Sequence, residues 1–284
     1  QYPPMPGVAP LREAVSKKVE ALYGHRYDPD TEVTITAGAT QAILTAVLCC
    51  VHPGDEVIVL EPCYDSYAPN IELAGGVVVR VPLDPGTFRP NFDAIAAAIT
   101  PRTRAIMVNS PHNPSGTILR DADLRELESI AVEHDLFVIS DEVYEHMVYD
   151  GEQHQSVSRY PLLASRAFVV SSFGKTFHAT GWKVGYCVAP PSLTAELRKV
   201  HQFLTFAVST PMQHAIADFM REQPQYADGL AAFYQERRDR FISLLEGSRF
   251  RLTRAAGTYF QLADYSEISD LPDADFCMEL VRRH

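Results

Sequence analysis

Short runs of β-branched and aromatic residues alternate with helix-like segments up to residue 190 of this chain. The predicted strands span residues 32–37, 55–60, 76–81, 104–109, 136–140, 167–172 and 184–189, and helical patterns lie at 41–51, 91–99 and 121–134. This alternation predicts an α/β fold with a mostly parallel seven-stranded sheet between helices. The connection before the last run is short for a helical crossover, so that strand is expected to run antiparallel.

The pattern changes beyond residue 191. Two helices are expected within 192–221, a long amphipathic helix over 226–247, and two strands within 250–266 that are interrupted at Gly257. We therefore expect a large domain over residues 14–230. The beginning of a smaller α+β domain is expected over residues 231–284.

The charge of the chain argues against nucleic acid and membrane as partners. There are 25 Lys and Arg residues against 36 Asp and Glu residues, a formal net charge of −11. No apolar run approaches the length of a membrane span, and the first ten residues do not resemble a signal peptide. The five cysteines show no CxxC spacing, which predicts a reducing cytoplasm and no metal site. A small-molecule ligand is favoured.

The segment 171–186, SSFGKTFHATGWKVGY, places a lysine where parallel sheets bind ligands. Lys175 follows a strand-like run, so it is expected at a carboxyl end, where an amine can lose its proton and attack a carbonyl. FGKT is not a P-loop, because that motif needs glycine where Val169 stands. A solvated surface lysine is the alternative. Ser172 and Lys183 favour the reactive amine, because a hydroxyl and a second ammonium could hold a phosphate nearby.

Other segments that follow predicted strands carry groups that a phosphorylated pyridine aldehyde would need. In AGATQAI, the amides of Ala39 and Thr40 would lie at a helix N-terminus, a natural phosphate site, although an ordinary capped helix has the same pattern. In EPCYDSY, Tyr64 could stack on a flat ring or simply pack.

Two further segments carry candidate partners for the ring itself. In SPHNPSG, Asn113 can donate to a phenolate oxygen, or the segment is only a turn. Asp141 follows the run 136–140, with Tyr144 three residues later, and it is either a helix cap or a carboxylate beside a pyridine nitrogen. Such a carboxylate would keep that nitrogen protonated and make the ring an electron sink.

In this order, the segments TAGATQAI, EPCYDSY, NSPHNPSG, SDEVYEH and SSFGKTFHATGWKVGY resemble class I/II aminotransferases of pyridoxal 5′-phosphate fold type I, the aspartate aminotransferase-like fold. Lysine in GWKVGY makes the chain most similar to the methionine and kynurenine/glutamine aminotransferase branch. The resemblance covers nearly the whole chain. It implies a ping-pong transaminase that moves an amino group from methionine, an aromatic amino acid or a glutamine-like donor to a 2-oxo acid.

The resemblance also implies a role for each candidate residue toward pyridoxal 5′-phosphate. Lys175 would bond the cofactor's aldehyde and act as the catalytic base, and Asp141 would pair with the pyridinium nitrogen. The other implied contacts are Asn113 and Tyr144 to the phenolate oxygen, Tyr64 stacked on the ring, and Ser172, Lys183 and the amides of Ala39 and Thr40 to the phosphate.

The opening segment QYPPMPGVAPLREAV resembles the family as well. In the family, the tyrosine after glutamine reaches the phosphate of the neighbouring subunit. Residues 1–13 are therefore expected to contact a partner, with Tyr2 completing the partner's site in a homodimer. A disordered terminal tyrosine is the alternative.

The family's arginine for the substrate carboxylate lies beyond the segment seen here. Arg251, Arg254, Arg282 and Arg283 match no such motif, and none is assigned that role. The chain starts without methionine and stops inside the helical pattern 273–284, which predicts truncation at both ends. If the chain is a fragment, the transaminase prediction stands. If it were complete, we would expect a non-catalytic pyridoxal-phosphate-binding module.

Two other functions use similar features. A pyridoxal-phosphate-dependent carbon–sulfur β-lyase would need the same lysine, aspartate and asparagine. A nucleotide-binding α/β protein is disfavoured, because the P-loop spacing fails and no GxGxxG is present.

Overall fold

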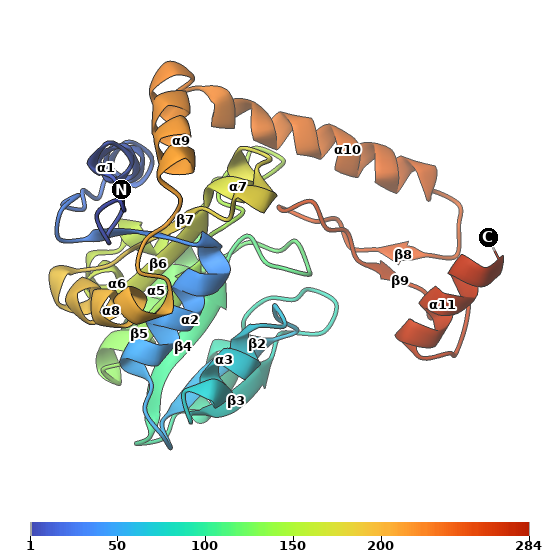
Figure 1. The fold of residues 1–284 in the computed structure, drawn as a ribbon. Helices are drawn as coiled ribbons and strands as arrows, with labels where there is room; N and C mark the ends of the chain where they lie inside the picture. The colour runs from blue at the N-terminus through green and yellow to red at the C-terminus, as the bar shows by residue number, and fades with distance from the viewer. Residues whose placement is uncertain (1, 284) are drawn as a thin grey trace.

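The computed structural model describes residues 2–283, and a seven-stranded sheet forms its centre (Figure 1). The strand order is β1-β7-β6-β5-β4-β2-β3. The strands are β1 (Val33–Thr36), β2 (Glu56–Glu61), β3 (Val77–Pro82), β4 (Thr103–Asn109), β5 (Phe137–Asp141), β6 (Ala167–Ser172) and β7 (Gly185–Val188). Strand β7 is antiparallel to β1 and β6, and the remaining neighbours pair in parallel. The predicted mostly parallel sheet and its antiparallel last strand are confirmed.

Helices cover both faces of this sheet (Figure 1). Their bounds are α1 (Ala9–Tyr23), α2 (Gly38–Cys50), α3 (Tyr67–Leu73), α4 (Phe92–Ala97), α5 (Asp121–Glu133), α6 (Pro161–Ala164), α7 (Phe173–Thr176), α8 (Pro191–Leu204), α9 (Thr210–Glu222), α10 (Leu230–Leu244) and α11 (Asp273–Arg283). Short 3₁₀ turns occupy Val157–Arg159, Thr180–Trp182 and Tyr226–Gly229. Helices α1, α5 and α9 pack on one face, and α2, α3 and α8 pack on the other.

The two apolar cores follow from the alternation of side chains along each strand. In β6, Val169 belongs to the core beneath α1 and α5, whereas Phe168 and Val170 belong to the core beneath α2. Both faces of the central strands are buried, which is why their sequences are nearly continuous apolar runs. Polar residues at the strand ends therefore stand out, and these ends carry the candidate site.

The C-terminal part differs from the prediction of two full strands. Only two short antiparallel strands form, β8 (Arg251–Leu252) and β9 (Ala263–Asp264). Between them the backbone bonds to loops of the large sheet instead: the Gly257 amide donates to Gly116, and the Thr258 amide donates to Met147. These hydrogen bonds to distant loops take the place of the strand-to-strand bonds that a longer β8–β9 hairpin would have. Helix α10 extends away from the large sheet toward β8, β9 and α11 (Figure 1).

Candidate active site

A cavity of about 290 Å³ opens at the carboxyl ends of β5 and β6, beside the N-terminus of α2. Nine of the ten residues proposed from the sequence line it: Ala39, Thr40, Tyr64, Asn113, Asp141, Tyr144, Ser172, Lys175 and Lys183. Tyr2, the tenth, is not among its lining residues. It lies exposed at the N-terminus, with its ring edge-on to Phe206.

One part of the cavity lining is rich in hydrogen-bond donors. Helix α2 begins at Gly38 without a side-chain cap, and its first-turn residues Ala39 and Thr40 line the cavity at the positive end of the helix dipole. Two positions beside this helix start, 38 and 185, leave little room for a larger side chain than that of glycine. A Cβ at Gly38 would lie 3.3 Å from the Lys183 ammonium, and a Cβ at Gly185 would lie 2.9 Å from the Ala39 nitrogen. These two glycines let the start of α2 approach the Lys183 side chain and the end of β7 closely.

A buried carboxylate lines the same cavity. Asp141 ends β5, and its side chain accepts hydrogen bonds from the Tyr67 hydroxyl at 2.8 Å and from the Val143 amide at 3.3 Å. Burial raises the pKa of Asp141 to about 6, while the Tyr67 and Val143 bonds lower it. A cationic nitrogen placed against this carboxylate would favour its ionised form.

Asn109 connects two of the lining segments. Its side-chain amide donates to the Asp141 carbonyl at 2.8 Å, and its side-chain oxygen accepts from the Asn113 backbone amide at 2.7 Å. Asn109 and Asp141 are also register partners in β4 and β5. Asn109 thus fixes the turn that carries Asn113 against the strand end that carries Asp141.

Lys175 lines the same cavity from the short helix α7. Ser172 begins this helix, because its hydroxyl accepts a hydrogen bond from the Gly174 amide at 3.2 Å. The half-buried Lys175 amine donates to the Tyr259 hydroxyl at 2.9 Å, and the ring of Tyr144 lies edge-on to that of Tyr259. Burial, followed by its hydroxyl contact with Tyr259, raises the pKa of Tyr144.

The cavity therefore fits pyridoxal 5′-phosphate in its donor set. Its lining supplies amides, a hydroxyl and an ammonium suited to phosphate, and a carboxylate suited to a ring nitrogen. It also supplies the Lys175 amine, and Tyr64 for stacking on the ring.

Comparison with known proteins identifies the family. The model of the family "Aminotransferase class I and II" matches residues 1–284. The chain belongs to the class I and II aminotransferases. It is 50% identical to a methionine aminotransferase of Escherichia coli (strain K12), covering all of this chain and 74% of that protein. A probable N-succinyldiaminopimelate aminotransferase of Mycobacterium tuberculosis is 42% identical, and the match covers 100% of this chain and 72% of that protein.

A solved Escherichia coli structure with a methionine aminotransferase function has the same fold. Its TM-score is 0.98 at 50% identity, and the match covers all of this chain and 75% of that one. The predicted family, its branch, the fold type, the transaminase class and the dependence on pyridoxal phosphate are thereby confirmed. The roles of individual residues in this aminotransferase remain predictions.

Several residues at the site were not predicted from the sequence, among them Asn109, Tyr67 and Tyr259. Asn109 was counted only as the end of a strand. Tyr67 is 74 residues from Asp141, and Tyr259 is 84 residues from Lys175. The one local signal was the position of Tyr67 three residues after Tyr64 in EPCYDSY, which places both on the same turn.

The four arginines left unassigned lie outside the lining of this cavity. Arg251 pairs with Glu267, Arg254 pairs with Asp150 and Asp239, and Arg283 pairs with Glu279. Within residues 2–283, no group of three or more His, Cys, Asp or Glu side chains could hold a metal ion. In the same range, no helix combines the length and apolarity needed to cross a membrane.

Proposed function

We propose that this aminotransferase takes the amino group of methionine or of another L-amino acid with an apolar, aromatic or glutamine-like side chain and transfers it to a 2-oxo acid. The observation that carries this proposal is one cavity whose lining joins the Lys175 amine, the first residues of α2 and the buried Asp141 carboxylate. Lys175→Ala, which should abolish amino transfer, tests it.

The residues that would hold the cofactor follow from the groups that line the cavity. The amides of Ala39 and Thr40, with Ser172 and Lys183, would bind the phosphate, and Asp141 would pair with the ring nitrogen. Asn113 and Tyr144 would donate to the ring oxygen, and Tyr64 would stack on the ring. Bound pyridoxal phosphate supplies an aldehyde that accepts the amino group and a ring that withdraws electrons from the substrate Cα.

The chain's own groups then handle the protons. The Lys175 Nζ is the base that takes the Cα proton of the amino acid, and the same atom returns a proton to the reacting centre. The Tyr259 hydroxyl, 2.9 Å from Nζ, orients this amine toward the cavity. Asp141 keeps a proton on the ring nitrogen by its negative charge, and burial from water strengthens that interaction.

The wall of the cavity supports an uncharged side chain on the amino donor. Apart from Lys175 and Lys183, its described lining has no cation that could pair with a distal carboxylate. Tyr144, Tyr259 and Phe260 instead offer apolar and aromatic surface near the lysine. The methionine aminotransferase at 50% identity agrees with this choice.

A panel of amino donors with one fixed 2-oxo acid acceptor tests this specificity. We expect kcat/KM for methionine, phenylalanine or glutamine to exceed that for aspartate by about tenfold or more, because aspartate would bring an unpaired carboxylate to an apolar wall. Faster turnover of aspartate would contradict the proposed donor class. Cystathionine belongs in the same panel, and release of thiol instead of amino transfer would identify a β-lyase.

We also propose a homodimer in which residues 1–13 contact the partner and Tyr2 completes the partner's phosphate site. Tyr2 is 82% exposed and touches Phe206, itself 43% exposed, and exposed aromatic side chains of this kind are typical of interfaces. Residues 14–230 would form the large cofactor-binding domain, and 231–284 would begin the small domain. The five free thiols agree with a cytoplasmic location.

Mixing two impaired variants tests the shared site. Lys175→Ala and Tyr2→Phe subunits, refolded together in equal amounts, should form mixed dimers in which one site has both Lys175 and a partner's tyrosine. About a quarter of all sites would then be restored, with activity measured at limiting cofactor. Activity no higher than the sum of the two separate variants would contradict the contribution of Tyr2 across the dimer.

A further inference from the structure

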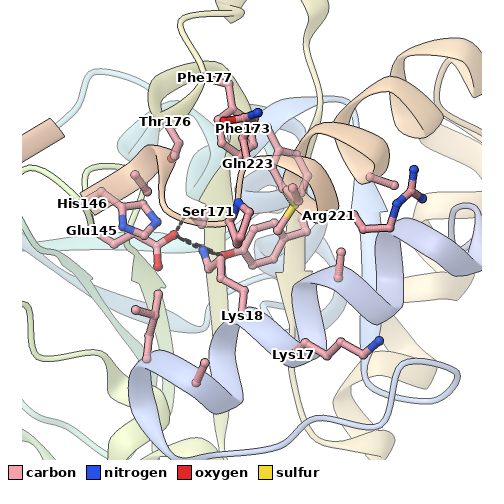
Figure 2. Close-up of a pocket in the computed structure, with 18 of the residues that line it drawn as sticks. Lys17, Lys18, Glu145, His146, Ser171, Phe173, Thr176, Phe177, Arg221 and Gln223 are labelled. Carbon is pink, nitrogen blue, oxygen red and sulfur yellow. Dashed lines mark hydrogen bonds and ion pairs between the residues drawn. The ribbon is translucent and has the colours of Figure 1, made fainter. Parts of the chain in front are cut away.

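A second cavity, of about 510 Å³, lies behind the cofactor site between α1, α9 and the end of β6. Its lining contains Lys18, Glu145 and Ser171, and Figure 2 shows Lys18 and Ser171 directed toward the Glu145 carboxylate. Ser172 lines both this cavity and the cofactor cavity. The two cavities therefore share one wall, formed by the strand end that leads to Lys175.

Glu145 is the centre of a buried polar network at this wall. Its Oε1 accepts from the Lys18 ammonium at 2.5 Å, from the Ser171 hydroxyl at 2.6 Å and from the Tyr186 hydroxyl at 3.2 Å. Its Oε2 accepts from the Tyr23 hydroxyl at 2.6 Å. The Glu145 side chain is 2% exposed. Such a set of donors suits an ionised carboxylate, which accepts hydrogen bonds only.

The charge of Glu145 is maintained by Lys18. Burial by itself raises the pKa of Glu145, but the nearby Lys18 ammonium and the hydrogen bonds outweigh burial and hold it well below its usual range. The Lys18 side chain is 17% exposed, so the pair keeps some contact with the cavity although the Glu145 side chain is buried. A buried ion pair of this kind is costly to break by removing one partner.

Glu145 joins two segments that both carry cofactor-site residues. It directly follows Tyr144, which lines the cofactor cavity, while its own side chain turns to the other cavity. Ser171 lines only the second cavity, and it directly precedes Ser172, which lines both. The bond between Ser171 and Glu145 therefore ties the Tyr144 turn to the start of α7.

We infer that Glu145 is a positioning residue of the cofactor site, fixing Tyr144 relative to Ser172 and Lys175 through its bond to Ser171. Lys18 and Tyr23 bond the same carboxylate to α1, which packs on the face of the sheet opposite α2. The site is therefore supported from that face as well. This inference rests on the proposed function, because it concerns the placement of residues proposed to hold the cofactor.

Ser171→Ala removes the link between the two segments and leaves Lys18 paired with Glu145. We expect its dissociation constant for pyridoxal 5′-phosphate to rise about tenfold. Without the bond from Ser171 to Glu145, several residues proposed to contact the cofactor are held less firmly at the same time. Quenching of the single tryptophan, Trp182, which directly precedes Lys183, measures this constant. The circular dichroism band of the bound cofactor should weaken as well, since it reports how firmly the ring is oriented. Glu145→Gln should show both effects more strongly.

Ser158→Ala is the matched control, because Ser158 is also a buried serine, and its hydroxyl bonds to Tyr27 outside the cofactor cavity. It should lose a similar amount of thermal stability while its cofactor affinity and dichroism stay within about twofold of wild type. Equal cofactor affinity and dichroism in Ser171→Ala and Ser158→Ala would overturn the positioning role of Glu145, even if Glu145→Gln failed to fold. A wild-type protein that bound no cofactor would instead refute the proposed function.

Discussion

Lys175→Ala is expected to lower kcat for amino transfer by about 10⁴-fold or more, because one amine provides both the bond to the cofactor and the base at Cα. The variant should also lose the absorbance band of the covalently held cofactor. Steady-state kinetics and an absorbance spectrum of the cofactor-loaded protein measure the two effects. Cofactor affinity should fall less than activity, since the other residues proposed to hold the cofactor are unchanged.

Lys199→Ala is a suitable control for the loss of a lysine. Lys199 lies on α8, is exposed, and pairs with Glu196. It should retain wild-type kinetics and the wild-type spectrum. If Lys175→Ala kept either substantial turnover or the covalent band, the assignment of Lys175 would be wrong.

Asp141→Asn is expected to reduce kcat by about 10³-fold or more, because a neutral amide cannot hold the ring nitrogen protonated by its charge. The same change should stabilise the cofactor-free protein. The native carboxyl keeps its proton up to about pH 6, whereas its ordinary pKa is 3.8, so ionisation favours the unfolded chain as the pH rises between these values. Asparagine does not ionise, so the Asp141→Asn protein does not lose stability in this way.

The stability of the two proteins should therefore diverge with pH in a defined direction. Near pH 4 their free energies of unfolding should be similar. Above about pH 6 the cofactor-free Asp141→Asn protein should be more stable by on the order of 2 kcal/mol. Denaturant titrations at several pH values measure the difference. An Asp141→Asn protein that is active, or that is destabilised above pH 6, would contradict the account of this carboxylate. Asp135→Asn, at an exposed aspartate paired with Arg166, should show neither effect.

Local sequence patterns were enough to locate most of the site. Parallel strands end at one edge of a sheet, so Asp141 and Ser172 could be brought together from the sequence without knowing the strand order. The helix N-terminus expected at Ala39 and Thr40 is likewise present, and Gly38, at the turn into it, has a φ of +77°. These predictions succeeded because each depends on a few neighbouring residues and on a general rule of α/β sheets.

Contacts between distant segments could not be read in the same way. Tyr259 reaches Lys175 because the chain from β8 to β9 bonds to the Gly116 and Met147 loops, and the apparent strand pattern of 250–266 concealed this. Lys18 and Glu145 are 127 residues apart, and a lysine on an amphipathic helix is ordinarily a solvated one. Their pairing depends on the packing of α1 against the sheet, which no single segment encodes.

The central claim is that Lys175 is the residue that holds the cofactor, and chemical reduction tests it most directly. Wild-type protein loaded with pyridoxal 5′-phosphate is treated with borohydride, digested and mapped by mass spectrometry. We expect the phosphopyridoxyl mass on the peptide that contains Lys175, at close to one label per chain. Labelling of Lys183, the other lysine in the cavity wall, or of any lysine in place of Lys175 would contradict the account.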